Sequence, residues 1–149
     1  MVKIALIGTG AISGIYLENL TEVFKAVEIV GVCDLIPERA QLASAFIRGQ
    51  QEKGLNCPTP KVYKDMHQAF NDPEVSVILN LTRPYEHYEV TKAALNAGKH
   101  VYAEKPLAVD MEEAVLQQDA YLRARQVFVR FLAIDWHKHD IAAHVACGR

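Results

Sequence analysis

The chain has 149 residues, of which 50% are hydrophobic, enough for one domain with a buried core and too few for two ordinary domains. Its 16 Lys and Arg residues and 18 Asp and Glu residues give a net charge of -2, so the basic excess expected of a general nucleic-acid-binding protein is missing. Short aliphatic runs, the first directly after Met-Val-Lys, predict neither a membrane span nor a signal peptide. Three cysteines without Cys-x-x-Cys spacing argue against a disulfide framework or a zinc ribbon and favour a cytoplasmic protein.

Short β-branched runs alternate with longer helical stretches along the chain. The expected strands are Lys3–Gly8, Val27–Cys33, Val75–Asn80 and His100–Ala103, with weaker candidates at Lys61–Tyr63 and Val127–Leu132. The expected helices are Ile12–Phe24, Glu38–Arg48, Asp65–Asn71, Glu86–Ala97 and Asp110–Arg125, and Gly49–Pro60 is predicted to be a surface loop. This alternation predicts an α/β domain built on a doubly wound parallel sheet over residues 1–126, followed by a divergent strand and tail over 127–149.

The first expected strand ends in a glycine-rich turn, Gly8-Thr9-Gly10-Ala11-Ile12-Ser13-Gly14. In such a turn Gly8 permits the tight bend, and Gly10 lets the backbone approach a phosphate without a Cβ in the way. The helix start at Ala11 and Ile12 supplies unpaired N–H groups and the positive end of the helix dipole. Ser13 occupies the third glycine position of G-x-G-x-x-G, a small departure that still permits close packing. The turn predicts a pyrophosphate-binding site.

Asp34 follows the second expected strand, where a carboxylate can accept hydrogen bonds from the ribose hydroxyls of adenosine. A carboxylate there repels a 2′-phosphate, so NAD is favoured over NADP. Arg39, one turn into the next helix, keeps NADP possible because it can pair with that phosphate or stack on adenine. Two other interpretations stay open: Asp34 caps the turn before Pro37, or the glycine turn and the acid belong to an S-adenosylmethionine-dependent methyltransferase.

Two further segments follow the fourth and fifth expected strands, at the edge where open α/β sheets bind ligands. The first contains Thr82, Pro84 and His87, and the second contains Glu104 and Lys105. Because successive strand residues point to opposite faces, Glu104 and Lys105 diverge, so that one can face the cleft while the other anchors to the scaffold. A lysine near a nicotinamide can donate a proton to an oxygen during hydride transfer. A lone lysine is otherwise an ordinary solvated surface charge.

Together these segments resemble the Gfo/Idh/MocA oxidoreductase family, from about Lys3 to Gln126. The residues that carry the resemblance are Gly8-Thr9-Gly10 with Ser13, Asp34, Asn80-Leu81-Thr82-x-Pro84-x-x-His87 and Ala97-Gly98-Lys99-His100-Val101-x-x-Glu104-Lys105-Pro106-Leu107. The resemblance implies a Rossmann-type domain that binds NAD or NADP. It implies that Lys105 is the catalytic lysine beside the nicotinamide, with Glu104 before it. It also implies that Thr82 and Pro84 lie along the cofactor and that His87 begins the next helix.

The resemblance also implies a longer protein. Family members continue into a second α/β domain that covers the nicotinamide, binds the substrate and often forms the oligomer interface, so we expect a full-length parent to be a homo-oligomer. We expect the 149 residues of this chain to lack that domain, and the resemblance is lost after about Gln126. The tail contains several residues of types that bind metals, but they do not match a known ligand set, and we predict no metal site there. These residues are Asp135, His137, His139, Asp140, His144 and Cys147. A shifted reading frame or an internal deletion is our hypothesis for this tail.

The expected function is hydride transfer between NAD, or NADP, and a sugar, cyclitol or related hydroxyl or carbonyl compound. The chain would supply the cofactor-binding part of this oxidoreductase, and we expect a small-molecule substrate without nucleic-acid or membrane partners. The alternative is a non-catalytic nucleotide-binding or interaction module, because without a second domain no pocket closes over Lys105. Turnover by the isolated chain separates the two.

Overall fold

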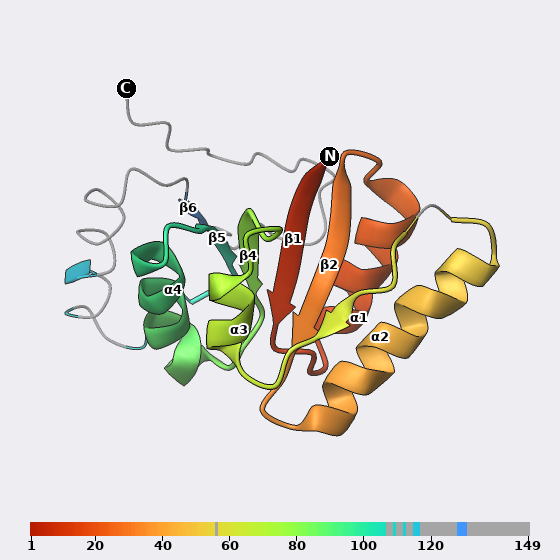
Figure 1. Cartoon of the computed structure of the whole chain (residues 1–149). Helices are drawn as coiled ribbons and strands as arrows, with labels where there is room; N and C mark the ends of the chain where they lie inside the picture. Colours follow the sequence, from red (N-terminus) through yellow and green to blue (C-terminus); the bar gives the residue numbers. More distant parts are fainter. Residues whose placement is uncertain (56, 107–108, 110–111, 113–114, 117–127, 131–149) are drawn as a thin grey trace, which may run out of the picture.

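The computed structural model describes residues 1–55, 57–106, 109, 112, 115–116 and 128–130 (Figure 1). In this part of the chain six strands form one sheet in the order β3-β2-β1-β4-β5-β6, and every neighbouring pair is parallel. This order is that of the dinucleotide-binding Rossmann fold. The strands are β1 (Val2–Ile7), β2 (Val27–Cys33), β3 (Lys61–Val62), β4 (Val77–Asn80), β5 (His100–Ala103) and β6 (Phe128–Arg130).

Along the chain the helices alternate with the strands, as the pattern predicts. A short helix, α1 (Ser13–Glu18), runs directly into a π-helical turn, η1 (Asn19–Val23). The remaining helical elements are α2 (Pro37–Glu52), α3 (Met66–Asn71), the 3₁₀ turn η2 (Pro84–Glu86) and α4 (His87–Asn96). None of the helices in the described part of the chain is long and apolar enough to cross a membrane.

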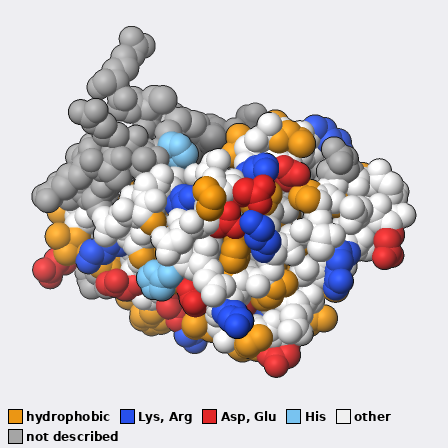
Figure 2. Space-filling model, in the orientation of Figure 1, with side chains coloured by type: hydrophobic (Ala, Val, Ile, Leu, Met, Phe, Trp, Pro, Cys, Tyr) orange, Lys and Arg blue, Asp and Glu red, His pale blue; other side chains and the backbone are white. Residues whose placement is uncertain are grey.

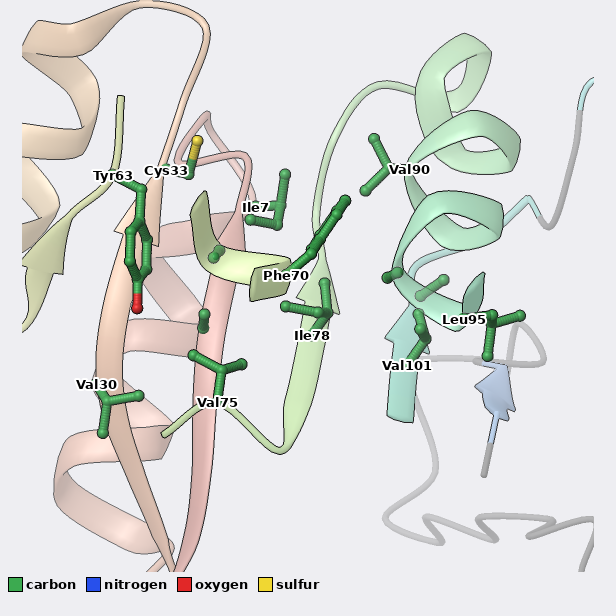
Figure 3. Close-up of a cluster of buried hydrophobic side chains, with 14 residues drawn as sticks. Ile7, Val30, Cys33, Tyr63, Phe70, Val75, Ile78, Val90, Leu95 and Val101 are labelled. Carbon is green, nitrogen blue, oxygen red and sulfur yellow. The ribbon is translucent and has the colours of Figure 1, made fainter. Parts of the chain in front are cut away.

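Both faces of the sheet are covered, which explains why the strands read as nearly continuous apolar runs. Alternate residues of β1 show this directly, because Ile4 and Leu6 belong to one buried cluster and Ala5 and Ile7 to the other. One cluster is completed by α1 and α2. The other is completed by α3 and α4, and its side chains are drawn in Figure 3 between the sheet and these two helices. The doubly wound architecture predicted from the sequence is therefore confirmed.

The surface carries both signs of charge. On the face seen in Figure 2, basic and acidic side chains lie interspersed over the described elements. Opposite charges also pair near the amino ends of β1 and β3, where Lys61 contacts both Asp72 (2.7 Å) and Glu74 (2.8 Å), and Lys3 contacts Glu74 (2.8 Å). This face therefore has no extended region of a single charge.

The carboxyl-terminal end of α2 differs from the prediction. The sequence predicts a helix ending at Arg48 and a loop from Gly49, whereas α2 continues to Glu52. Gln50, only 2% exposed, explains the extension, because its Nε2 donates a hydrogen bond to Glu22 at 2.8 Å and ties the last turn of α2 to η1. This tertiary contact outweighs the helix penalty of Gly49, which is about 1 kcal/mol. The chain then leaves the helix at Gly54, whose φ is +88°.

The carboxyl-terminal part of the chain is only partly described. The expected helix Asp110–Arg125 falls mostly outside the described residues, although Glu112, Val115 and Leu116 are helical. The expected sixth strand is present as β6, whose three residues pair with β5, so the sheet continues past residue 126. The histidine-containing tail and Cys147 lie outside the described residues, and the structure does not test the predictions made for them.

Candidate functional site

The glycine turn after β1 requires glycine at Gly8 for two independent reasons. Its φ is +91°, a conformation that L side chains rarely adopt. A Cβ at this position would also lie 2.7 Å from the carbonyl carbon and oxygen of Leu81 and 2.8 Å from the N atom of Thr82. Gly8 therefore provides the tight bend and also brings the turn against the end of β4.

The next residues leave the start of α1 open. A Cβ on Gly10 would meet nothing within 4 Å, so the space above this backbone is free in the structure. Ile12, the residue before the helix, makes no capping hydrogen bond with its side chain. Ser13 is 4% exposed and its hydroxyl donates to the Gly10 carbonyl at 2.7 Å, so the third glycine position is filled by a buried, hydrogen-bonded small residue. The first N–H groups of α1, around Ala11 and Ile12, are consequently available for an anion.

Asp34 lies beside this turn and holds it. Its Oδ2 accepts hydrogen bonds from the N–H of Thr9 at 2.7 Å and from the Thr9 hydroxyl at 3.1 Å. Its Oδ1 accepts the N–H of Ile36 at 2.9 Å. The turn-capping contact weighed from the sequence is therefore present, and the carboxylate is at the same time joined to the glycine turn.

Arg39 lies on the first turn of α2. It lines an open groove of about 210 Å³ between α1 and α2, together with Thr9, Ser13 and Leu17 and three apolar residues of α2. Its guanidinium makes no hydrogen bond or ion pair with the part of the chain that the structure describes. Arg39 is thus free to meet a ligand that reaches this groove from the glycine turn.

Asn80, at the end of β4, organises the second segment. Its side chain is fully buried, and its Nδ2 donates to the His87 carbonyl at 3.1 Å and to the Thr91 hydroxyl at 3.0 Å. Its Oδ1 accepts from the N–H of Thr82 at 3.2 Å and from the Thr82 hydroxyl at 2.6 Å. All the hydrogen-bonding capacity of the amide is used, so the loop that carries Thr82 is fixed to the start of α4.

His87 joins the second segment to the third. The ring is 1% exposed, with Nε2 at 2.8 Å from the Thr82 carbonyl and Nδ1 at 2.6 Å from the Pro106 carbonyl. A neutral imidazole carries one N–H and an imidazolium two, so the ring donates to at least one of these carbonyls. His87 thus connects the loop after β4 to the loop after β5. A direct contact between this ring and a cofactor stays a prediction.

Glu104 and Lys105 diverge at the end of β5. Glu104 is the anchored member: Oε1 accepts a short hydrogen bond from the Tyr16 hydroxyl of α1, and Oε2 accepts the N–H of Lys105 at 3.0 Å. Burial, and then the hydrogen bond to Glu104, raise the pKa of Tyr16, which therefore remains a donor. The Lys105 side chain is exposed and has no partner among the described residues.

The predicted site residues thus fall into three groups. The glycine turn and Asp34 form one hydrogen-bonded unit, and Thr82, His87 and the Lys105 segment form a second. Pro84 begins η2, where Arg83 and Glu86 pair, and the hydrogen bond from Arg83 lowers the pKa of Glu86. Arg39 forms the third group and lines a groove together with Thr9 of the first unit. Residues that sequence reasoning left out of the site are Thr9, Tyr16 and Asn80, although Asn80 stands in the quoted Asn-Leu-Thr motif.

Comparison with known proteins agrees with this geometry. The family model of the Gfo/Idh/MocA oxidoreductases, described as having an NAD-binding Rossmann fold, matches residues 2–131. An inositol 2-dehydrogenase/D-chiro-inositol 3-dehydrogenase of Lactiplantibacillus plantarum is 34% identical over 132 residues, which cover 87% of this chain and 35% of the relative. An inositol 2-dehydrogenase of Salmonella typhimurium is 33% identical, with 87% of this chain and 37% of the relative covered.

Solved structures point the same way. The myo-inositol dehydrogenase of Lactobacillus casei, determined in complex with NAD(H) and myo-inositol, has a TM-score of 0.72 and 30% identity over 83% of this chain and 34% of its own. An NAD-binding protein from Listeria innocua has a TM-score of 0.71 and 26% identity, over 87% of this chain and 34% of its own. The chain therefore spans about a third of the length of these relatives. On this evidence the chain belongs to the Gfo/Idh/MocA oxidoreductase family and comprises its Rossmann-fold nucleotide-binding domain.

Proposed function

We propose that this chain is the NAD-binding part of an oxidoreductase that moves a hydride between the nicotinamide and a cyclitol, or a related sugar hydroxyl or carbonyl compound. The observation that carries the proposal is the hydrogen bond from the Thr9 N–H to Asp34 Oδ2 at 2.7 Å. It brings the turn suited to a pyrophosphate and the carboxylate suited to a ribose into one unit. NADP stays possible because Arg39 is near this unit.

The proposed roles follow from where each side chain lies. The backbone at Gly8 and Gly10 and the first N–H groups at Ala11 and Ile12 bind the pyrophosphate, and Asp34 binds the adenosine ribose. Arg39 meets the adenosine end, from the groove between α1 and α2. The backbone of the turn is fixed to β2, because the N–H of Gly8 donates to the Cys33 carbonyl at 2.9 Å.

The second group of residues orients the reacting end. When bound, the nicotinamide supplies the hydride acceptor or donor. Thr82 and Pro84 lie along the nicotinamide. Glu104 and His87 hold the loops after β4 and β5 in place. Nζ of Lys105 carries the proton to or from the substrate oxygen. Lys105 suits this role because its neighbours Glu104 and Pro106 are both hydrogen-bonded while its own side chain is left exposed.

The substrate class comes from the relatives, two of which are named as inositol dehydrogenases. Because the chain spans about a third of their length, the residues that close over the nicotinamide and select a substrate would lie outside it. We propose that such a parent protein is a cytoplasmic homo-oligomer. The second candidate is a nucleotide-binding module without turnover, favoured by the exposure of Lys105 to solvent.

Two measurements test the proposal. Titration of the chain with NADH, followed by nicotinamide fluorescence, should give saturable binding that Asp34→Ala weakens for NADH more than for NADPH. Turnover of myo-inositol and a panel of sugars and polyols then separates the two candidates. Turnover by the chain alone would rule out the module without activity, and saturable binding without turnover would favour it. Absence of NADH binding to the folded chain would refute both.

A further inference from the structure

The carboxylate of Asp34 is already largely occupied by the protein itself. A carboxylate offers about four acceptor positions, two on each oxygen. Both positions on Oδ2 are taken by Thr9, through its N–H at 2.7 Å and its hydroxyl at 3.1 Å. One position on Oδ1 is taken by the N–H of Ile36 at 2.9 Å. The remaining acceptor position on Oδ1 is therefore the one that a ribose hydroxyl can use without breaking a contact.

We infer that Thr9 is a positioning residue that determines cofactor specificity, an inference that rests on the proposed NAD site. Its hydroxyl holds the Asp34 carboxylate in one orientation, with Oδ1 directed to the ribose and the negative charge fixed where a 2′-phosphate would have to lie. Without this hydroxyl the carboxylate would keep two contacts, from the N–H of Thr9 on Oδ2 and from the N–H of Ile36 on Oδ1. The hydroxyl adds a third contact, which narrows the range of orientations open to the carboxylate.

The surroundings of Thr9 support this role. Thr9 is 8% exposed, so its side chain is enclosed and its hydroxyl has little access to water as an alternative partner. The adjacent Gly8 N–H donates to the Cys33 carbonyl at 2.9 Å, which fixes the backbone of the turn against the same strand end that carries Asp34. The donor and acceptor are thus held by two rigid elements, 25 residues apart in the sequence.

The inference makes a specific prediction for Thr9→Val, which keeps the shape and removes the hydroxyl. A hydrogen bond to a charged group is strong enough that its loss should weaken NADH binding by about three- to tenfold. NADPH binding should be unchanged or tighter, because a carboxylate held by two contacts in place of three can shift away from the 2′-phosphate more readily. The preference for NADH over NADPH should therefore fall by about the same factor. Thr9→Ser, which keeps the hydroxyl, should retain the preference.

The experiment is a fluorescence titration of the wild-type chain and each variant with NADH and with NADPH. Thr21→Val is the matched control: Thr21 is equally buried and its hydroxyl donates to the Leu17 carbonyl at 2.7 Å, within the helix and away from the site. This control should leave the NADH to NADPH ratio unchanged. Circular dichroism of each variant checks that it is folded, and Thr9→Ala replaces Thr9→Val if the valine does not fit.

The outcomes separate the inference from the function on which it rests. If the wild-type chain binds neither dinucleotide, the proposed function and the inference both fail. If the wild type prefers NADH and Thr9→Val or Thr9→Ala keeps the same preference, the specificity role of Thr9 is wrong while the proposed function stands. An equal loss of both cofactors would likewise overturn it, because Thr9 would then support the turn without selecting the cofactor. A reduced preference restored in Thr9→Ser supports the inference.

Discussion

Replacing Asn80 by alanine should be among the most damaging single changes in the described part of the domain. Asn80 is fully buried, and its amide makes four hydrogen bonds that connect the end of β4 to the loop carrying Thr82 and to the start of α4. Alanine removes all four and leaves the partner groups to find water or remain unsatisfied. Both the stability of the domain and the geometry of the proposed nicotinamide end depend on this amide.

The size of the effect follows from the number of contacts. A hydrogen bond contributes about 1 kcal/mol net, and leaving a buried partner unsatisfied costs about 1 to 3 kcal/mol. The Thr82 hydroxyl can rotate toward another acceptor, whereas the Thr82 N–H cannot, and the Thr91 hydroxyl and the His87 carbonyl each lose a donor. We therefore expect Asn80→Ala to lower the free energy of unfolding by roughly 3 to 5 kcal/mol. That is a large part of the roughly 5 to 15 kcal/mol available to a domain.

Urea unfolding followed by far-UV circular dichroism measures this quantity. Thr91→Val is the matched variant, because Thr91 is also fully buried and the change removes only one of the four contacts, so it should cost about 1 kcal/mol. In the double variant the Thr91 change should add almost nothing, since its partner is already lost. A loss below about 1 kcal/mol for Asn80→Ala would refute the view that this amide organises the loop.

Three further predictions concern other elements. Gly8→Ala should abolish NADH binding and strongly destabilise the domain, because its Cβ would lie 2.7 Å from backbone atoms, whereas Gly14→Ala, with open space around it, should be harmless in urea unfolding and binding assays. Lys105→Met in a full-length parent enzyme should lower turnover by about two to four powers of ten with nearly unchanged NADH affinity; undiminished turnover would remove Lys105 from catalysis. The Lys61 ammonium lowers the pKa of Asp72 from 3.8 to about 2, so the stability that this pair contributes is present above pH 3.8 and is lost as the pH falls through 2. Solvent screens the half-exposed Lys61, so the effect should be small, and Lys61→Met should abolish this part of the acid sensitivity in unfolding titrations.

Local pattern alone was sufficient for the architecture. A parallel strand buried on both faces must be apolar along its length, and for that reason Val27–Cys33 and His100–Ala103 were predicted with the boundaries they have as β2 and β5. The glycine turn was equally readable, because a residue with φ of +91° in contact with the next loop can only be glycine, and Gly8 is placed where strand meets helix. The spacing of apolar residues and the backbone conformation of a turn depend on residues that are neighbours in the chain, so the sequence determined them directly.

The partners of the site residues were decided by the tertiary structure. Asp34 and Thr9 are 25 residues apart and Tyr16 and Glu104 are 88 apart, so no local pattern indicates that they share hydrogen bonds. His87 begins α4, as the resemblance implies, but only the fold shows that its buried ring contacts the carbonyls of Thr82 and Pro106 in two different loops. A motif specifies which side chains lie near the strand ends. Which of them faces a ligand and which holds another in place depends on the packing of α1 and α4 against the sheet, and only the folded chain contains that information.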